Sequence, residues 1–113
     1  MEIFKWLDDS SFVKFHSIND FRKSEAIFYL NLKIHFVNNS ELHVREYLDA
    51  DHRKYSFHCQ SYNGDLITRW DNAPHFPDLI TFPHHKHLAS GEVIESYDIS
   101  LEEILGLIRN MVV

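Results

Sequence analysis

The sequence has little cysteine and little glycine: among 113 residues there is one cysteine and there are three glycines. Because Cys59 has no second cysteine to pair with, an internal disulfide is excluded, and a lone cysteine is typical of a reducing compartment. The three glycines are isolated from one another, so no glycine-rich loop is present to cradle a nucleotide phosphate. This absence argues against a nucleotidyltransferase.

The sequence also lacks a long apolar run. No stretch reaches about 18 apolar residues, which is the length that a membrane-spanning helix needs. The first residues contain no charged start followed by an apolar segment, so we expect no signal peptide. These absences predict a cytoplasmic protein that does not enter a membrane.

Basic residues are in the minority, with 11 Lys and Arg against 17 Asp and Glu, and the net charge is −6 when histidines are neutral. Broad, non-specific binding of nucleic acid usually needs a basic surface, so this net charge argues against that class of binding. A small basic pocket on an acidic body remains compatible with this charge. The nine histidines make the local charge depend on pH, because imidazole titrates near neutrality.

Apolar residues are plentiful enough for one core, at 44% of the chain, and 14% of residues are aromatic. This length and composition predict a single domain over residues 1–113. Apolar side chains recur at every second position in several segments, the period of strands with one buried face. The predicted strands are 11–22, 26–36, 41–48, 53–61 and 65–71, with shorter candidates at 85–88 and around Val93 and Ile94.

Helix signals stand at the two ends of the sequence. Ser100 is followed by Glu103, which is the pattern of a capping box, and an apolar stripe continues from there to Met111. Residues 2–9 favour a second, short helix. The predicted fold class is α+β: an antiparallel meander sheet of about five strands with a C-terminal helix on its apolar face.

Turn positions predict which polar side chains share the other face of the sheet. A two-residue turn at Asn63-Gly64 places His58 opposite Arg69 and Ser56 opposite Asp71. With a three-residue loop at 38–40 and the apolar faces kept aligned, two rows are predicted across the sheet. They are Lys33, Arg45, His58 and Arg69 in one row, and Asn31, Tyr47, Ser56 and Asp71 in the next.

Cations that face one another across a sheet are unfavourable unless an anion lies near them. The first predicted row therefore indicates an anion-binding site, which Asp71 or Glu46 could instead compensate from within the protein. The alternative is a solvated strand face, where lysine and arginine stems cover apolar surface. Because the alternation places Glu46 on the apolar face, we expect it to be paired, at an edge or re-aimed by a bulge.

The most unusual stretch is DNAPHFPDLITFPHHKHL, residues 71–88, which holds four of the nine histidines and all three prolines. Proline restricts the backbone, so we expect a stiff loop that holds its side chains in place at low entropic cost. In an extended segment His85 and His87 point to the same side, and His84 points to the other.

Histidines in this density have three explanations. Two imidazoles on the same side suit zinc or manganese, with His75 or Asp71 as the third ligand. Histidines beside arginines also suit proton transfer in catalysis. The third explanation is a set of surface histidines without a role.

Four motifs of the sequence are long and distinctive. They are Arg45-Glu46-Tyr47, Tyr55-Ser56-Phe57-His58, the run from Arg69 to His75 (RWDNAPH) and the run from Thr81 to His87 (TFPHHKH). In these motifs the chain resembles the TumE-like toxin family, small proteins of bacterial and archaeal type II toxin–antitoxin loci. The resemblance covers about residues 24–110. It implies a toxin that a small helix-turn-helix antitoxin neutralises, and it brings no catalytic assignment with it.

The residues favour a ribonuclease toxin that needs no cofactor. RNA cleavage without a metal requires a base for the 2′-hydroxyl, an acid for the leaving 5′-oxygen and cations for the phosphorane. We expect the acid–base pair to be His58 and one of the histidines of the loop, the phosphate to lie on two arginines, and Tyr47 to stack on a base or donate a proton. The candidate site residues are Arg45, Tyr47, His58, Arg69, Asp71, His75, His84, His85 and His87.

Two other functions stay open at this point. One is a metal-dependent enzyme or metal-stabilised fold that holds zinc or manganese through His75, His85 and His87. The other is a non-enzymatic toxin that binds a host partner through an exposed sheet edge or an aromatic patch.

Overall fold

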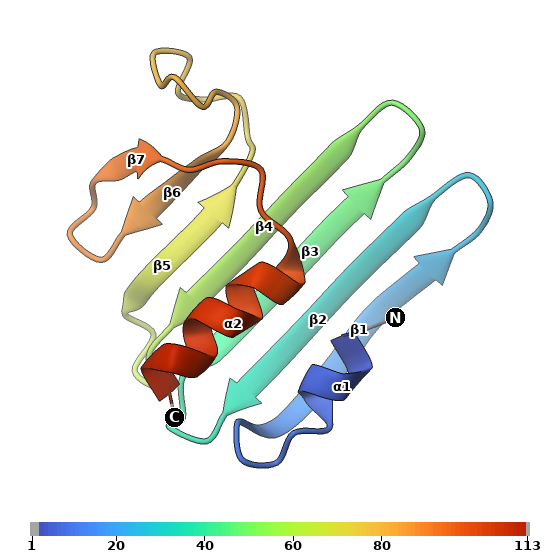
Figure 1. Cartoon of the computed structure of the whole chain (residues 1–113), viewed down its shortest axis with the longest axis vertical. Helices are drawn as coiled ribbons and strands as arrows, with labels where there is room; N and C mark the ends of the chain where they lie inside the picture. The colour runs from blue at the N-terminus through green and yellow to red at the C-terminus, as the bar shows by residue number, and fades with distance from the viewer. Residues whose placement is uncertain (1–2, 113) are drawn as a thin grey trace.

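The computed structural model describes residues 3–112, which form one antiparallel sheet and two helices (Figure 1). In chain order the elements are α1 (Ile3–Leu7), β1 (Val13–Lys23), β2 (Phe28–Phe36), β3 (Glu41–Leu48), β4 (Arg53–Gln60), β5 (Leu66–Asp71), β6 (His85–Leu88), β7 (Val93–Glu95) and α2 (Leu101–Val112). Each strand pairs with the next one along the chain, so the sheet is a meander from β1 to β7.

The predicted α+β class, the antiparallel meander and the C-terminal helix are confirmed, but the prediction of about five strands is wrong: the sheet has seven. The two strands beyond that number are β6 and β7, which contain four and three residues and lie at the positions of the two shorter candidates. Segments this short carry little periodicity, and they form here because the chain returns beside β5. The predicted helix at 2–9 is present as α1, although residue 2 lies outside the described residues.

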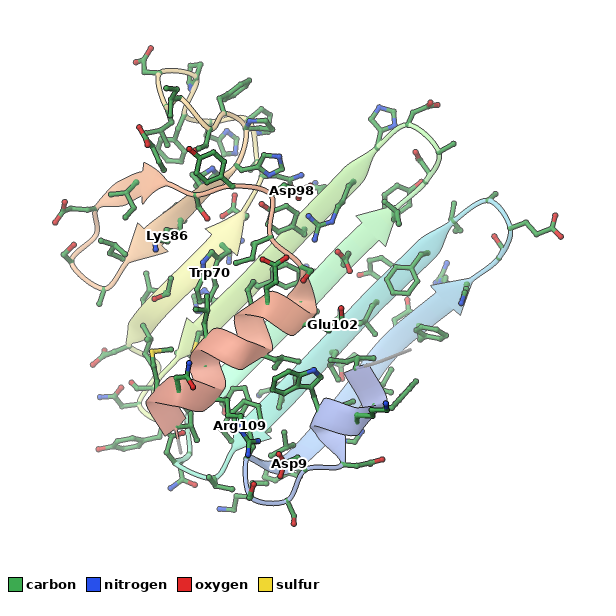
Figure 2. All side chains as sticks on the ribbon, viewed as in Figure 1. Asp9, Trp70, Lys86, Asp98, Glu102 and Arg109 are labelled. Atoms are coloured by element: carbon green, nitrogen blue, oxygen red, sulfur yellow. The ribbon has the colours of Figure 1, made fainter. Side chains whose placement is uncertain are left out.

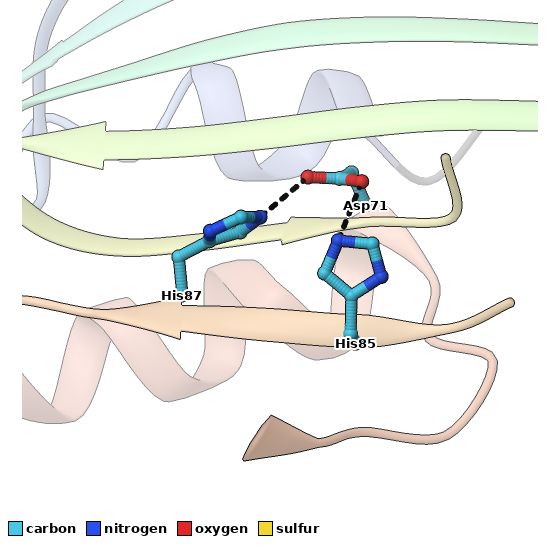
Figure 3. A group of neighbouring side chains, drawn as sticks. All are labelled: Asp71, His85 and His87. Carbon is cyan, nitrogen blue, oxygen red and sulfur yellow. Dashed lines mark hydrogen bonds and ion pairs between the residues drawn. The ribbon is translucent and has the colours of Figure 1, made fainter. Parts of the chain in front are cut away.

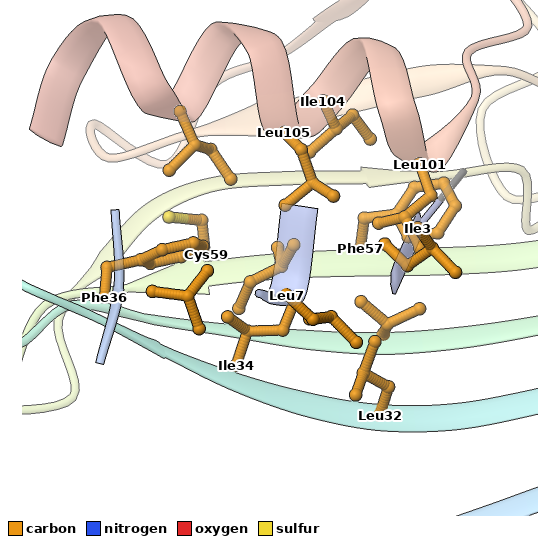
Figure 4. Packing of buried hydrophobic residues seen from close by; sticks show 14 of the residues in the cluster. Ile3, Leu7, Leu32, Ile34, Phe36, Phe57, Cys59, Leu101, Ile104 and Leu105 are labelled. Carbon is orange, nitrogen blue, oxygen red and sulfur yellow. The ribbon is translucent and has the colours of Figure 1, made fainter. Parts of the chain in front are cut away.

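Both helices cover the same face of the sheet (Figure 1). The alternating apolar residues of the strands meet α1 and α2 there, as Figure 4 shows. Fully buried members are Phe12, Leu32, Ile34, Phe36, Leu42, Val44, Phe57, Cys59, Ile104, Leu105 and Ile108. Burial raises the pKa of the Cys59 thiol to about 11, so this lone cysteine is part of the core and not a reactive group.

The capping box predicted for α2 is present. Ser100 Oγ accepts a bond of 3.1 Å from the Glu103 amide, and Glu103 Oε1 accepts bonds from the Ser100 amide and hydroxyl. At the other end of α2, Arg109 forms an ion pair with Asp9, which follows α1 (Figure 2). In residues 3–112 no helix combines the length and the apolar character required to cross a bilayer.

Glu46 lies on the apolar side of β3 and is paired, as expected. Arg53 donates to Glu46 Oε2 from Nη2 at 2.7 Å and from Nε at 3.0 Å. The same guanidinium donates to the Ile99 carbonyl and contacts Asp98, which ties the segment before α2 to the sheet. The charge on the covered face is therefore compensated locally.

The predicted register between β4 and β5 is confirmed: His58 lies opposite Arg69, and Ser56 lies opposite Asp71. The turn itself differs from the prediction. Ser61 donates its amide to the Asp65 carbonyl, so the loop has three residues, and Gly64 supplies the positive φ of 89°. A bulge beside Cys59 absorbs the difference, so the register is unchanged beyond it.

The predicted registers of β3 against β2 and β4 are wrong, although the faces are right. The first loop closes at 37–39 and not at 38–40, because Asn39 takes the positive φ of 70°, and Lys33 then lies opposite His43. In the second loop the Asp49 carboxylate accepts bonds of 2.8 Å from the amides of residues 51 and 52. This Asx turn closes a tight loop, with Leu48 opposite Arg53, and so places Arg45 opposite Ser56.

Candidate functional site

Two rows of polar side chains cross the face of the sheet that the helices leave uncovered. Directly opposed residues of antiparallel strands project to the same side, so each register row is a surface row. The first row contains Lys33, His43, His58, Arg69 and His87, and the second contains Asn31, Arg45, Ser56, Asp71 and His85. Arg45 is thus a diagonal neighbour of His58 and not its direct partner.

A groove runs over the middle of these rows, and we call it the polar-face groove. Arg45, Ser56 and Arg69 line both of its two adjoining hollows, which measure about 280 and 330 Å³. Other polar-face residues flank these three: His43, His58 and Gln60 at one end, and Tyr29, Tyr47 and Lys54 at the other. The groove therefore combines imidazoles, cations and phenol rings on one surface.

Arg45 is an arginine of this groove that the protein leaves uncompensated, as it leaves the exposed Lys54. Its side chain is exposed, and its guanidinium has no ion pair or hydrogen bond within residues 3–112. Arg69, in contrast, donates from Nε to Asp71 Oδ2 over 3.0 Å. Arg45 therefore has no carboxylate partner, whereas the neighbouring Arg69 has one. The unused donors of the Arg45 guanidinium are suited to binding an anionic ligand.

His58 is held in one tautomer by its neighbours. Its Nε2 lies 3.1 Å from Gln60 Oε1, which only accepts, so Nε2 carries the proton. The lone pair of Nδ1 then faces Arg69 Nη1 at 3.5 Å. Burial, and next the charge of Arg69, lower the pKa of His58 below its usual 6.5, so this imidazole is neutral at pH 7 and able to accept a proton.

Glu41 organises the end of the groove next to His58. Its Oε2 accepts from His43 Nε2 at 3.0 Å and from Gln60 Nε2 at 3.3 Å, and its Oε1 lies 3.3 Å from His35 Nδ1. The bond from His43 is the main effect that holds the pKa of Glu41 below its usual range, against the opposing effect of burial. The carboxylate is therefore ionised at neutral pH and fixes the His43 ring, whose centre is 6.0 Å from that of His58.

Asp71 joins the groove to the histidines of β6 (Figure 3). Its Oδ1 lies 2.9 Å from His85 Nε2 and its Oδ2 lies 3.2 Å from His87 Nε2. Burial would raise the pKa of Asp71, but bonds from the Ala73 amide and from Arg69, with the charges of His85 and Arg69, hold it below its usual range. Burial lowers the pKa of His87, although the charge of Asp71 opposes that shift.

The proline-containing segment 72–84 folds over these histidines. The Phe76 ring meets the His85 ring edge-on at 4.8 Å and the His87 ring at 5.8 Å. Asn72 pins the start of the segment to β4, where its side chain donates to the Arg53 carbonyl and accepts from the Tyr55 amide. Phe76 thus shelters one end of the polar face, which explains why His85 is only 1% exposed.

The remaining predicted site residues lie elsewhere. His84 stacks on Tyr55, whose hydroxyl is 2.8 Å from His84 Nδ1, and this contact is on the side of the sheet that carries the core. His75 is exposed on the loop. Tyr47 lines the groove and donates its hydroxyl to Asp49 at 2.8 Å, which raises the pKa of the phenol.

Comparison with known protein families identifies the family of the chain. A family model described as "Toxin TumE" matches residues 3–112, nearly the whole chain. The chain belongs to the TumE toxin family. Comparison with the curated proteins and with the solved structures gave no match. Membership in the TumE family gives the chain the role of a toxin, and a toxin of this family acts with an antitoxin partner.

The structure of this TumE family toxin adds three residues that sequence reasoning missed: Glu41, His43 and Gln60. Gln60 lies two residues after His58 on β4, and Glu41 and His43 lie beside them because β3 pairs with β4 two residues away from the predicted register. The signal for the correct register was Asp49, since an aspartate at the start of a loop commonly accepts a bond from the amide two residues further on and so forms an Asx turn. With that turn assigned, His43 falls opposite His58.

Proposed function

We propose that this TumE family toxin cleaves RNA in the polar-face groove by acid–base catalysis that uses no metal ion. The observation that carries the proposal is the uncompensated Arg45 guanidinium, which lies in one groove with Arg69 and the neutral His58. Cleavage of a phosphodiester requires cations for the charge that develops on phosphorus and a base next to them. This groove offers both on one surface.

The groove binds two parts of the RNA, the phosphate at the arginines and an unpaired base at the tyrosines. Arg45 takes a non-bridging phosphate oxygen, and Arg69 takes another when it turns from Asp71. Tyr29 and Tyr47 line the other end, where phenol rings suit stacking on an unpaired base. Recognition of single-stranded RNA through so few contacts agrees with a chain whose net charge is −6, because only the groove needs to be cationic.

In the proposed reaction His58 Nδ1 takes the proton of a 2′-hydroxyl, and the 2′-oxygen attacks the adjacent phosphorus. The bond from phosphorus to the 5′-oxygen breaks, and His43 gives the leaving oxygen a proton. The products are a 2′,3′-cyclic phosphate and a free 5′-hydroxyl. Glu41 and Gln60 orient the two imidazoles, since each bonds to one ring. His43 takes the role that the sequence alone assigns to a histidine of the loop.

The test uses tag-free protein and end-labelled single-stranded RNA in the presence of a chelator. We expect wild-type protein to cleave, and His58→Ala, Arg45→Ala and Arg69→Ala each to reduce the rate by about 100-fold or more. Arg45→Lys keeps the charge but loses the fork of donors, so its rate falls between those of wild type and Arg45→Ala.

Two matched controls separate the groove from a general loss of charge or imidazole. Lys86 lies opposite the buried Trp70 and so projects to the other side of the sheet (Figure 2). His16 lies on the far strand β1 and is exposed. Lys86→Ala and His16→Ala keep the wild-type rate. Wild-type rates in all three folded groove variants would remove the proposed site, and pull-down of a host protein without cleavage would favour a non-enzymatic toxin.

The antitoxin in this proposal is a small helix-turn-helix protein encoded beside the toxin, and the toxin acts in the cytoplasm, where its RNA substrate is. The support is the resemblance carried by the Arg45–Tyr47 and Arg69–His75 motifs. A neighbouring open reading frame without a helix-turn-helix pattern would contradict this part of the proposal.

A further inference from the structure

His85 is a buried imidazole with one nitrogen left unsatisfied. Its Nδ1 lies 2.9 Å from the Pro83 carbonyl oxygen, an atom that only accepts, so Nδ1 carries a proton. Its Nε2 has no hydrogen-bond partner within residues 3–112, although Asp71 Oδ1 is only 2.9 Å away. The contact is close, but its geometry is not that of a hydrogen bond. A polar atom in a side chain that is 1% exposed requires an explanation.

In the neutral imidazole, Nδ1 holds the proton and the Nε2 lone pair of His85 faces the carboxylate of Asp71. Two electron-rich groups at this distance repel each other unless a proton or a metal ion lies between them, and the geometry of this contact is not that of a hydrogen bond through a proton. A backbone carbonyl that receives Nδ1–H is also the usual outer partner of a histidine that binds a metal through Nε2. Both features of His85 therefore indicate a cation beside Nε2.

His87 supplies a third candidate ligand atom close to Asp71 and His85. His87 Nε2 is 3.2 Å from Asp71 Oδ2, and the ligand atoms of Asp71, His85 and His87 all lie within 4.8 Å of one another (Figure 3). Ligand atoms in a tetrahedral zinc site are about 3.3 Å apart, given zinc–nitrogen bonds of about 2.0–2.1 Å. The separations of 2.9 and 3.2 Å, which run to the two different oxygens of Asp71, are close to this spacing, and the limit of 4.8 Å shows how far the three ligand atoms have to approach one another around one ion.

The residues around Asp71, His85 and His87 suit a metal ion with one coordination position left open to solvent. Phe76 covers the two rings, and Ala73 donates its amide to Asp71 and so orients the carboxylate. Arg69 donates to Asp71 Oδ2 at 3.0 Å and is the competing cation, because an ion at this oxygen releases the guanidinium into the polar-face groove. His87 lies in the same register row as Arg69 and borders that groove.

We infer that Asp71, His85 and His87 form a binding site for one divalent transition-metal ion, with Zn²⁺ as the ion. Two imidazoles and one carboxylate are a donor set that zinc accepts, and water fills the fourth position. The ligand set differs from the one expected from the sequence, because Asp71 takes the place of the exposed His75. The inference is independent of the proposed cleavage, which is tested in a chelator.

The test is a calorimetric titration of metal-free, tag-free full-length protein with ZnCl₂, with the melting temperature measured on the same samples. We expect one Zn²⁺ per chain and a rise in melting temperature when the ion is added. His87→Gln and Asp71→Asn each weaken binding by about 100-fold or more, at least the loss that follows removal of an outer partner. His75→Ala binds like wild type and serves as the matched histidine control.

His85→Gln tests the central ligand, and circular dichroism shows whether this buried variant folds. If it does not fold, His87→Gln decides, since the His87 side chain is 26% exposed. The visible absorption of bound Co²⁺ gives a second signal. We expect the strong absorption of a four-coordinate site in the wild-type protein and its loss in the ligand variants. No binding by wild type, or wild-type affinity in both the His87→Gln and Asp71→Asn proteins, would overturn the site whether or not RNA is cleaved.

Discussion

At the scale of the residue, three histidines of the polar face are kept neutral by the fold. Burial lowers the pKa of His35, His58 and His87, and in each case it is the largest effect. In the proposed mechanism the shift of His58 is useful, because a base with a proton already bound is unable to accept another. The environment that disfavours its charge is thus part of the proposed mechanism.

These shifts predict how stability depends on pH. A histidine with a lowered folded pKa is neutral in the fold and gains a proton more readily when unfolded, so its contribution is present above 6.5 and is lost as the pH falls through the folded pKa. We expect the free energy of unfolding, measured in urea, to decrease from about pH 7.5 to about pH 5, above the range where carboxylates titrate.

The His58→Gln protein gives the specific check of this dependence. Glutamine has no charged form, so the variant loses the share of the slope that His58 provides. His16→Gln, which removes an exposed imidazole on β1, retains the wild-type slope. Equal slopes in the wild-type and His58→Gln proteins would show that the fold does not hold His58 neutral.

At the scale of the element, α2 stabilises the fold from the side opposite the groove. Its first turn depends on the reciprocal bonds of Ser100 and Glu103. We expect Ser100→Ala to lower the free energy of unfolding by about 1 kcal/mol, the usual loss for an N-cap, in urea denaturation. RNA cleavage by the folded variant stays at the wild-type rate, because the cap touches no groove residue.

Ser10→Ala is the control for this change, because Ser10 is exposed and precedes β1. It leaves the free energy of unfolding near that of wild type. An equal loss in both variants would indicate that the capping box contributes nothing specific to α2.

The strands were predictable from the sequence, but most of their pairing registers were not. Period-two alternation predicted β2, β3 and β4 and their buried faces, because a strand with one covered face must alternate. Registers depended on single loop residues: Asn39 and Asp49 moved β3 along its neighbours by their turn conformations. The turn at Asn63-Gly64 was the exception, because its bulge restored the expected pairing.

The same reasons decide how much of the site was predictable. The grouping of His58, Arg69 and Asp71 followed from one hairpin, and it was predicted. The place of His43 required the correct loop at Asp49, and the shelter of His85 by Phe76 required the path of the loop, which no local pattern encodes.

At the scale of the whole molecule, the fold separates stability from binding. The helices and the core occupy one face of a flat body of 40 × 39 × 20 Å, which leaves the opposite face free for polar chemistry. On a chain of net charge −6, two arginines with neighbouring imidazoles form a local cationic surface. This arrangement agrees with the proposed function, in which the toxin engages RNA at one place and does not coat it.

The chemistry of the RNA ends tests the central claim most directly. Wild-type, tag-free protein is incubated with single-stranded RNA in a chelator, and both new termini are identified by sequencing and by enzymatic end-labelling. Attack by the 2′-hydroxyl, with His58 as its base, predicts a 2′,3′-cyclic phosphate on one fragment and a 5′-hydroxyl on the other. Fragments that carry a 3′-hydroxyl and a 5′-phosphate, or RNA that stays intact, would contradict the account.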